Sequence, residues 1–230
     1  MSAPDTKTQT RRDGADLRLV ERLGALYVGV VADCLDAAGV RNNVMATTIR
    51  PLDPEVAVAG YAATFQLAAT ETTPEKPADY YAGEIAAVES VQPGDVIVAS
   101  TLDRSFWGEL LATATEALGG LGIVADAYTR DTAALLKMGF PTYVAGTEAS
   151  DALGRVEVVD HGIPVRCGGV LVHPADLVLA DRDGVVVLPS DVAEEVIAAA
   201  EKKASEENQV RAALREGTSL SVAFATYGIL

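Results

Sequence analysis

The sequence predicts a mixed α/β fold in which a parallel strand–helix–strand segment precedes a region of short strands and one long C-terminal helix. Three observations support this class. Between residues 96 and 145, helical segments alternate with apolar runs of the kind found in strands covered on both faces. Short β-type runs separated by turns fill residues 156–188. Residues 191–216 keep one helical pattern throughout.

Composition is that of a globular protein with a substantial core. The chain has 230 residues, of which 49% are hydrophobic and 22% charged. Only 5% are aromatic, so the core must be built mainly from Ala, Val, Leu and Ile. The net charge of −15 argues against a nucleic-acid backbone or an anionic membrane as partner, because both select positive patches. A small anionic substrate remains compatible with this charge.

The chain is expected to form one domain after a polar tail. Residues 1–14 have the composition of a mobile tail, and no low-complexity linker divides residues 15–230. The N-terminal residues contain no apolar signal core, and no stretch approaches the roughly 20 apolar residues of a membrane span. Cys34 and Cys167 are far apart in sequence without metal-type spacing, which favours reduced, buried thiols and a cytoplasmic protein.

Helices and strands alternate in the first hundred residues. Residues 17–38 have a helical pattern that ends at Gly39, with a soft spot at residues 28–31 and a possible second helix from Ala32. The following elements are predicted, in order, as a strand at 56–67, a polar loop at 70–78, a short helix at 80–88, a turn at 92–95 and a strand at 96–99.

The segment from Trp107 to Asp131 is the most informative. A helix is predicted from Gly108 to the Gly119-Gly120 pair, which suits the left-handed turn that ends helices, and a buried strand follows at 121–125. A helix of about ten residues spans roughly 15 Å and a five-residue strand about 16 Å. We therefore expect the end of the strand to return to the start of the helix.

This return predicts a cluster of charged residues at one edge of the sheet. Glu109, Asp126, Arg130 and Asp131 should lie beside the free backbone amides of the helix N-terminus. Such an edge can bind an anion and a hard cation together. Each residue also has a structural interpretation: Asp131 as a helix N-cap, Glu109 as a first-turn acid favoured by the helix dipole, and Arg130 as a partner of the nearby aspartates.

The rest of the chain completes the α/β pattern. A helix at 131–138, ended by Gly139, leads to a strand at 142–145 and implies right-handed crossovers. The short runs at 156–188 are expected to form an antiparallel or mixed sheet packed on the first. The helix at 191–216, with Ser190 as its cap, has acidic residues beside its apolar stripe. These residues either form a solvated face or reach a neighbouring subunit.

Several segments together resemble the RraA-like family, and they extend over residues 17–220. The matching segments are VADCLDAAG (31–39), GYAATF (60–65), PGDVIVAS (93–100), WGELLATA (107–114), GLGIVADAYTRD (120–131), GFPTYVAGT (139–147) and PVRCGGVLVHPADLVLADRDGVVVLP (164–189). The WGELLATA segment and the Arg-Asp pair are the most specific. Two positions depart from the family pattern: Ala175 stands where the family usually has glycine, and Glu109 stands where some aldolases have aspartate.

The resemblance implies a three-layer α/β/β sandwich of the swivelling-domain type, assembled as a homotrimer or homohexamer with the active site between subunits. It implies a metal-dependent class II aldolase, a carbon–carbon lyase that cleaves a 4-hydroxy-2-oxo acid of the 4-hydroxy-4-methyl-2-oxoglutarate type to pyruvate and a second oxo acid. Oxaloacetate decarboxylation is the implied side activity, since it passes through the same pyruvate enolate. The alternatives are a non-catalytic RraA-type regulator that binds a ribonuclease, and a related lyase or hydrolase acting on another oxo acid.

The resemblance also implies roles for individual residues. Asp131 is placed beside a Mg²⁺ or Mn²⁺ ion, and Glu109 holds water bound to that ion. Either Glu206 or Glu207, from the C-terminal helix of an adjacent subunit, does likewise. Arg130 contacts the ketone and stabilises the enolate. The amides around Gly108, Leu110 and Leu111 hold the pyruvate carboxylate.

Overall fold

A computed structural model of the chain describes residues 14–229. The predicted tail therefore lies outside the described residues, apart from Gly14, which begins the first helix. The helices are α1 (Gly14–Gly24), α2 (Val28–Ala37), the 3₁₀ helix η1 (Pro77–Asp79), α3 (Ala82–Glu89), α4 (Glu109–Ala117), α5 (Thr132–Met138), α6 (Ala193–Arg215) and α7 (Leu220–Tyr227). The strands are β1 (Arg50–Pro51), β2 (Val58–Ala69), β3 (Asp95–Ala99), β4 (Ser105–Trp107), β5 (Gly122–Thr129), β6 (Thr142–Thr147), β7 (Val156–His161), β8 (Val165–Cys167), β9 (Val170–Val172), β10 (Leu177–Asp181) and β11 (Gly184–Leu188).

Nine strands form one sheet, and β8 and β9 form a separate hairpin. The main path of the sheet runs β1-β6-β5-β3-β2-β10-β11, with β4 beside β5 and β7 beside β2. Neighbours β2, β3, β5 and β6 pair in parallel, joined by helices, which confirms the predicted parallel segment. The strands β7, β10 and β11 pair antiparallel.

Strand β2 joins the two halves of the sheet because it is long enough to pair with different neighbours along its length. Its first residues pair with β10, its middle with β3 and its last with β7. Inward-facing side chains of β2, β3 and β5 share one core with inward-facing side chains of β10 and β11. The second half therefore packs face to face on the first, as predicted, but it belongs to the same curled sheet and does not form a separate one.

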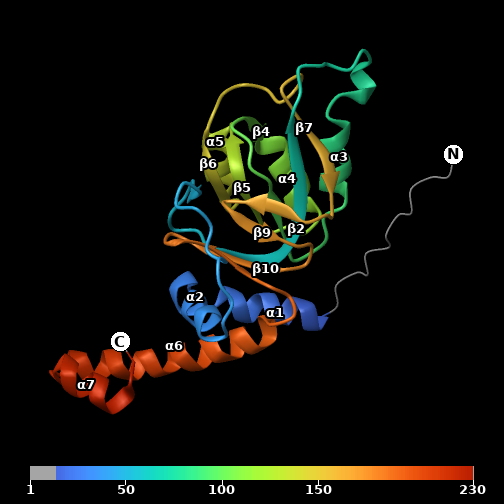
Figure 1. Cartoon of the computed structure of the whole chain (residues 1–230). Coiled ribbons are helices and arrows are strands. Elements are labelled where there is room, and N and C mark those ends of the chain that lie inside the picture. Colours follow the sequence, from blue (N-terminus) through green and yellow to red (C-terminus); the bar gives the residue numbers. More distant parts are fainter. Residues whose placement is uncertain (1–13, 230) are drawn as a thin grey trace.

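Helices cover the outer faces of this curled sheet, as Figure 1 shows. Buried residues of α3, α4 and α5 share a core with the alternate residues of β2, β3 and β5. Helices α1, α2 and α6 share another core with the outer faces of β10 and β11. The α/β/β layering is thus confirmed, and α1, α2 and α6 add a further helical layer beneath it.

The helix predicted at 17–38 is divided, and the division comes earlier than expected. Tyr27 is extended, with φ −123° and ψ 153°, and α2 begins at Val28 instead of Ala32. The Val28 N–H donates to the Asp181 carboxylate across 2.9 Å. Asp181 thus satisfies a backbone donor that a helix start leaves free. Because Asp181 is far away in the sequence, the local pattern around residue 28 does not reveal this helix start.

Two other elements differ from their predicted bounds. Strand β5 continues to Thr129 and does not end at Ala125, because β4 pairs in parallel with its second half. Helix α6 takes Val192 as its N-cap and not Ser190. At the position where the family usually has glycine, Ala175 keeps a left-handed backbone, with φ 69°, so the turn survives at the expense of local strain.

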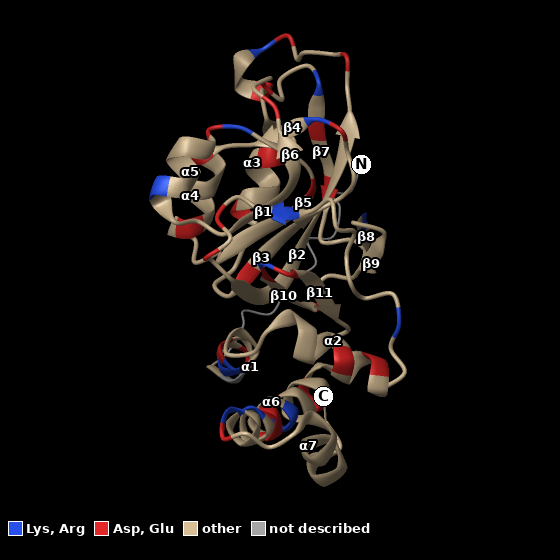
Figure 2. Cartoon of the chain, turned by 90° about the vertical axis from the view of Figure 1, so that its left-hand side faces the viewer, with Lys and Arg blue, Asp and Glu red and all other residues tan. Residues whose placement is uncertain are grey.

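Helix α6 extends beyond the body of the molecule and carries α7 at its far end (Figure 1). Helices α1 and α6 carry charged residues of both signs (Figure 2), and Arg22 of α1 bonds to Glu194 and Glu201 of α6. Several large apolar side chains of α7 are exposed: Leu220, Val222, Phe224 and Tyr227. Within residues 14–229, no helix combines the length and the apolar character needed to cross a membrane.

A substitution at Gly83 tests the packing of α3 on β7. A Cβ atom at Gly83 would lie 2.0 Å from the backbone oxygen of Val158, which cannot move without displacing β7. Gly83→Ala is therefore expected to lower the free energy of unfolding by about 1–3 kcal/mol in urea denaturation. Gly29→Ala is the control: it meets only Tyr27, at 3.6 Å, inside α2, and should raise stability by about 0.5–1 kcal/mol. Equal stability of the two variants would contradict this packing.

Candidate active site

The candidate site lies where two parallel strands end and two helices begin. Strand β4 ends at Trp107, and Gly108 alone separates it from α4; β5 ends at Thr129, and Arg130 and Asp131 separate it from α5. The two ends are tied together because the Arg130 N–H and the Thr129 hydroxyl both donate to the Trp107 carbonyl, at 3.0 and 3.1 Å. Carboxyl ends of parallel strands are the usual place for ligands in α/β sheets.

Asp131 connects the two helix starts. Its Oδ2 accepts a hydrogen bond from the Glu109 backbone N–H, the first residue of α4, at 3.2 Å. Asp131 precedes α5 but makes no side-chain cap bond to that helix. Asp131 is thus the N-cap residue of α5 by position, as the structural interpretation expected, but its carboxylate serves the neighbouring helix. Its backbone is left-handed, with φ 58°, a conformation that aspartate tolerates better than most residues and that is found at functional sites.

Gly108 permits this close approach. A Cβ atom at Gly108 would lie 2.6 Å from Asp131 Oδ2 and 3.5 Å from Arg130 Cγ. Any side chain at this position would push the Arg-Asp pair away from the start of α4. The backbone of Gly108 is extended, with φ −159°, so the requirement is for space and not for an unusual conformation.

Arg130 is held between two carboxylates. Its Nε lies 3.8 Å from Asp131 Oδ2, and its Nη1 lies 3.3 Å from Asp151 Oδ1. The Tyr81 hydroxyl donates to the other oxygen of Asp151, at 2.7 Å. The hydrogen bond from Tyr81 and the charge of Arg130 lower the pKa of Asp151, outweighing the opposing effect of burial. Asp151 therefore stays ionised and orients the guanidinium.

A cavity of about 210 Å³ opens beside this group. Its lining consists of Tyr81, Glu84, Ser105, Phe106, Gly108, Leu110, Leu111, Arg130, Asp131, Asp151 and Ala152. A second hollow, of about 380 Å³, lies on the other side of Arg130 and Asp131 and also includes Thr147 and Glu148. Both residues are thus reachable from solvent on two sides, and their side chains are 38% and 47% exposed.

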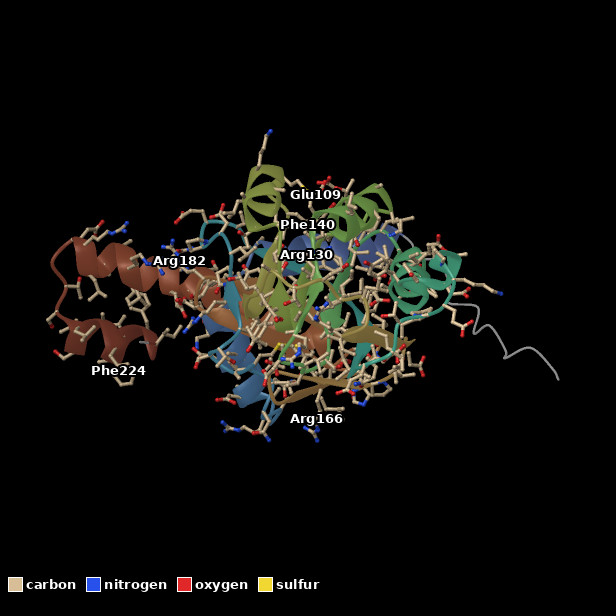
Figure 3. The ribbon with its side chains drawn as sticks, turned by 90° about the horizontal axis from the view of Figure 1, so that it is seen from above. Glu109, Arg130, Phe140, Arg166, Arg182 and Phe224 are labelled. Atoms are coloured by element: carbon tan, nitrogen blue, oxygen red, sulfur yellow. The ribbon has the colours of Figure 1, made fainter. Side chains whose placement is uncertain are left out.

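The remaining predicted residues lie at different distances from this centre. Glu109 and Arg130 lie in the same part of the molecule (Figure 3), but the Glu109 carboxylate accepts from the Thr113 hydroxyl at 2.9 Å. Asp126 does not join the cluster as predicted: its carboxylate accepts from the Thr101 hydroxyl and the Gly168 N–H. Its position within β5, several residues before the strand ends, accounts for the difference.

Glu206 and Glu207 lie on α6, which packs with α1 and α2 beside β10 and β11, away from the candidate site. Glu207 accepts a hydrogen bond from the Tyr27 hydroxyl, and Glu206 lies 3.8 Å from Lys202. Burial and the bond to Glu207 raise the pKa of Tyr27 to about 12. Within one chain, neither glutamate is brought to Arg130 and Asp131.

The side chains available as metal ligands limit how a metal ion can be held. Among the described residues, no three side chains of His, Cys, Asp or Glu are grouped as metal ligands. Asp131 offers hard carboxylate oxygens at the cavity, whereas the Glu109 carboxylate is bonded to the Thr113 hydroxyl and is not among the lining side chains. Mg²⁺ commonly uses one or two carboxylates and fills its remaining positions with waters and substrate oxygens. The residues fit a lightly held magnesium-type ion and do not fit a caged structural metal.

The sequence did not identify the three other titratable residues that line the cavity. Asp151 lies in the loop between β6 and β7, Tyr81 has a left-handed backbone directly before α3, and Glu84 lies in the first turn of α3. None belongs to a motif, and loop residues have no periodicity to indicate where they point. The sequence signal that could have identified Glu84 is an acidic residue in the first turn of a short, mainly apolar helix.

The fold and site define an α/β protein with a cavity at the carboxyl ends of parallel strands, lined by Arg130 and Asp131. The sequence model of the RraA-like family, described as Aldolase/RraA, matches residues 28–187. The chain therefore belongs to the RraA-like family, which confirms the resemblance.

Individual relatives agree with this assignment. A protein of Halalkalibacterium halodurans with the provisional name 4-hydroxy-4-methyl-2-oxoglutarate aldolase is 30% identical over 196 residues, covering 84% of this chain and 87% of that protein. Streptomyces coelicolor RraAS2, described as an unusual member of the RNase ES inhibitor RraA family, is 30% identical with a TM-score of 0.75, covering 87% of this chain and 98% of the other. An uncharacterised protein of Pseudomonas syringae pv. tomato shares the fold, with 23% identity, a TM-score of 0.77 and coverage of 94% and 99%.

The bond between Tyr81 and Asp151 can be tested by titration. It raises the pKa of Tyr81, because deprotonation would remove the hydrogen bond and place a phenolate beside a carboxylate. Asp151→Asn should lower the pKa of Tyr81 toward the ordinary tyrosine value, measured by NMR with ¹³Cζ-labelled tyrosine. Tyr81→Phe identifies the resonance by removing it. An unchanged pKa in Asp151→Asn would show that this bond does not form in solution.

Proposed function

We propose that the protein is a class II aldolase that cleaves a 4-hydroxy-2-oxo acid of the 4-hydroxy-4-methyl-2-oxoglutarate type to pyruvate and a second oxo compound. One observation carries the proposal: Arg130, Asp131 and the first amides of α4 converge on one cavity. The aldolase name of a 30% identical relative supports the same reaction. Oxaloacetate decarboxylation is the expected side activity, because it forms the same enolate.

The start of α4 suits the pyruvyl carboxylate. The first helical hydrogen bond of α4 runs from Ala112 N to the Gly108 carbonyl, at 3.1 Å. The N–H groups of Leu110 and Leu111 precede it and belong to the set that a helix leaves free for an anion. Leu110 and Leu111 both line the cavity, and the extended backbone of Gly108 leaves space for the carboxylate.

Arg130 is the residue that we propose to stabilise the enolate. Cleavage of the C3–C4 bond leaves negative charge on the C2 oxygen, and a fixed cation beside that oxygen lowers the barrier most where water is excluded. Asp151 and Asp131 hold the guanidinium from two sides, so little reorganisation is needed as the charge develops. Glu109 orients a water that takes the proton of the C4 hydroxyl as the bond breaks.

A divalent cation, Mg²⁺ or Mn²⁺, fits this mechanism as cofactor. Asp131 and Glu109 would hold it with the help of water, together with a glutamate of a second subunit. When bound, it supplies a Lewis acid for the ketone oxygen. Such an ion would also balance the acidic residues that line the cavity.

The active site is proposed to lie between subunits of a homotrimer or homohexamer. The α6–α7 arm extends away from its own body and exposes apolar side chains such as Phe224, which suits contact with another subunit (Figure 3). Glu207 is held against its own chain by Tyr27, whereas Glu206 has only a long contact with Lys202. We therefore assign Glu206 as the residue that reaches the neighbouring site.

The runner-up function is a non-catalytic regulator that binds a ribonuclease. The 30% identity to RraAS2, from the RNase ES inhibitor RraA family, favours it. A lyase or hydrolase acting on another oxo acid is the third candidate. In all three cases we propose a cytoplasmic protein that binds no membrane and no nucleic acid directly. Pyruvate release separates the enzyme from the regulator.

The aldolase is tested with a panel of oxo acids. Purified protein with Mg²⁺ should release pyruvate from 4-hydroxy-4-methyl-2-oxoglutarate, 4-carboxy-4-hydroxy-2-oxoadipate or oxaloacetate, measured with a coupled lactate dehydrogenase assay. Arg130→Ala should lower kcat by about 10²–10³-fold, because it removes the fixed charge beside the enolate oxygen. A chelator should abolish the activity and Mg²⁺ should restore it. Absence of pyruvate with every acid and both metals would favour the regulator.

Subunit mixing tests the shared site. Arg130→Ala and Glu206→Gln should each be nearly inactive alone. After co-refolding, mixed oligomers should regain activity, because some interfaces pair an intact Arg130 with an intact Glu206. Glu207→Gln is the matched control and should keep most of its activity. If the mixed oligomers are no more active than the sum of the two separate variants, the site is not built from two subunits.

A further inference from the structure

The cleavage proposed above leaves one proton transfer without a residue. Breaking the C3–C4 bond produces pyruvate enolate, and C3 of that enolate must take up a proton before pyruvate leaves as the keto acid. A positioned side chain that supplies such a proton accelerates the step by about 10²–10⁴-fold. An acid that keeps its proton at neutral pH and lies close to C3 would therefore complete the reaction.

Tyr81 is held at the wall of the cavity beside Arg130. Its backbone is left-handed, with φ 56°, a conformation that persists in a tyrosine only where the surroundings impose it. Its ring packs against the core that α3 and α4 share with the sheet. Its hydroxyl donates to Asp151 Oδ2 at 2.7 Å, and the other Asp151 oxygen lies 3.3 Å from Arg130 Nη1. One carboxylate thus joins the Tyr81 hydroxyl to the guanidinium.

The other polar side chains of the lining are less suited to this transfer. The pKa of Asp151 is lowered, so this carboxyl has no proton to give at neutral pH. Asp131 is the proposed ligand of a cation, which binds only the deprotonated carboxylate. Glu84 and Ser105 are 3% and 2% exposed, and Glu84 Oε1 and Ser105 Oγ are shielded from solvent. Among the described lining residues, Tyr81 is therefore the best-placed proton donor.

We propose that Tyr81 is the general acid that protonates C3 of the pyruvate enolate, and that Asp151 positions its hydroxyl. This inference rests on the aldolase function proposed above. With the substrate carboxylate at the start of α4 and the C2 oxygen at Arg130, C3 lies one bond beyond C2, on the side of Tyr81. The electrons of the C2–C3 double bond form the new C–H bond, C2 returns to a ketone, and the hydroxyl proton leaves the Tyr81 oxygen.

The surroundings of the hydroxyl suit this cycle. The hydrogen bond to Asp151 and burial raise the pKa of Tyr81, so the hydroxyl is protonated when the enolate forms. A phenol is still a far stronger acid than the methyl group of a ketone, so proton transfer to C3 is favourable. The phenolate that remains is disfavoured beside the Asp151 carboxylate. It therefore takes a proton from water in the open cavity, and the acid is ready for the next turnover.

Exchange of the pyruvate methyl protons tests Tyr81 directly, because exchange runs this step backwards and forwards. In D₂O with Mg²⁺, the wild-type protein should replace these protons with deuterium, measured by ¹H NMR. Tyr81→Phe should slow the exchange by at least about 100-fold, because it removes the acid–base group and keeps the ring. Tyr80→Phe is the matched control: it removes the hydroxyl of the neighbouring ring, 6.5 Å away between centroids, and should match the wild type.

Two further measurements separate proton transfer from positioning of Arg130. Oxalate affinity in the presence of Mg²⁺ should be unchanged in Tyr81→Phe, since oxalate takes up no proton. Oxaloacetate consumption should fall by less than about tenfold, because the enolate formed by decarboxylation can take its proton from solvent after release. Pyruvate should then appear after a lag that the wild type lacks. Equal losses of exchange and decarboxylation, with weakened oxalate binding, would show that Tyr81 acts only through Arg130 and would overturn the inference.

The outcomes distinguish this inference from the function on which it rests. Methyl exchange that Tyr81→Phe leaves unchanged overturns the role of Tyr81 alone and leaves the aldolase intact. Wild-type protein that cleaves oxo acids but does not exchange the methyl protons of pyruvate does the same. Absence of both pyruvate release from every oxo acid and methyl exchange overturns the aldolase and the inference together.

Discussion

The contact between Asp131 and the start of α4 is the constraint on which the site depends. It requires β4 and β5 to end side by side, which their parallel pairing ensures, and it requires a residue without a side chain between them. Gly108 meets that need, and the Glu109 N–H then reaches the Asp131 carboxylate. Arg130 lies at the same point because it directly precedes Asp131 in the sequence. The geometry of the candidate site therefore follows from backbone register more than from side-chain packing.

The curled sheet explains how a chain with few aromatic residues supports such a site. Strand β2 pairs with β10, β3 and β7 along its length, so both sheet halves surround one interior of mainly Val and Ala side chains. Small β-branched residues pack closely across this interior and hold the strand ends rigidly. Local backbone strain lies at the cavity, in the left-handed conformation of Asp131. Such strain is expected where binding takes precedence over stability.

The parallel segment and the meeting of Asp131 with the start of α4 followed from the sequence because both depend on local pattern and element length. Long-range contacts did not follow from it. The early start of α2 depends on Asp181, and the full length of β5 depends on β4. Asp151 reaches Arg130 from a loop whose course no periodicity predicts. The acids of α6 contact residues in another part of the chain, and neither reaches the site of its own chain.

Calorimetric titration with oxalate, a planar mimic of pyruvate enolate, tests the central claim most directly. If the start of α4, Arg130 and a Mg²⁺ ion form one anion site, oxalate should bind once per chain in the presence of Mg²⁺. Binding should be lost in Arg130→Ala, and also in Gly108→Ala, whose Cβ would displace Asp131. Equal oxalate affinity in the wild type and both variants, or no binding to the wild type, would contradict the convergence of these groups on one cavity.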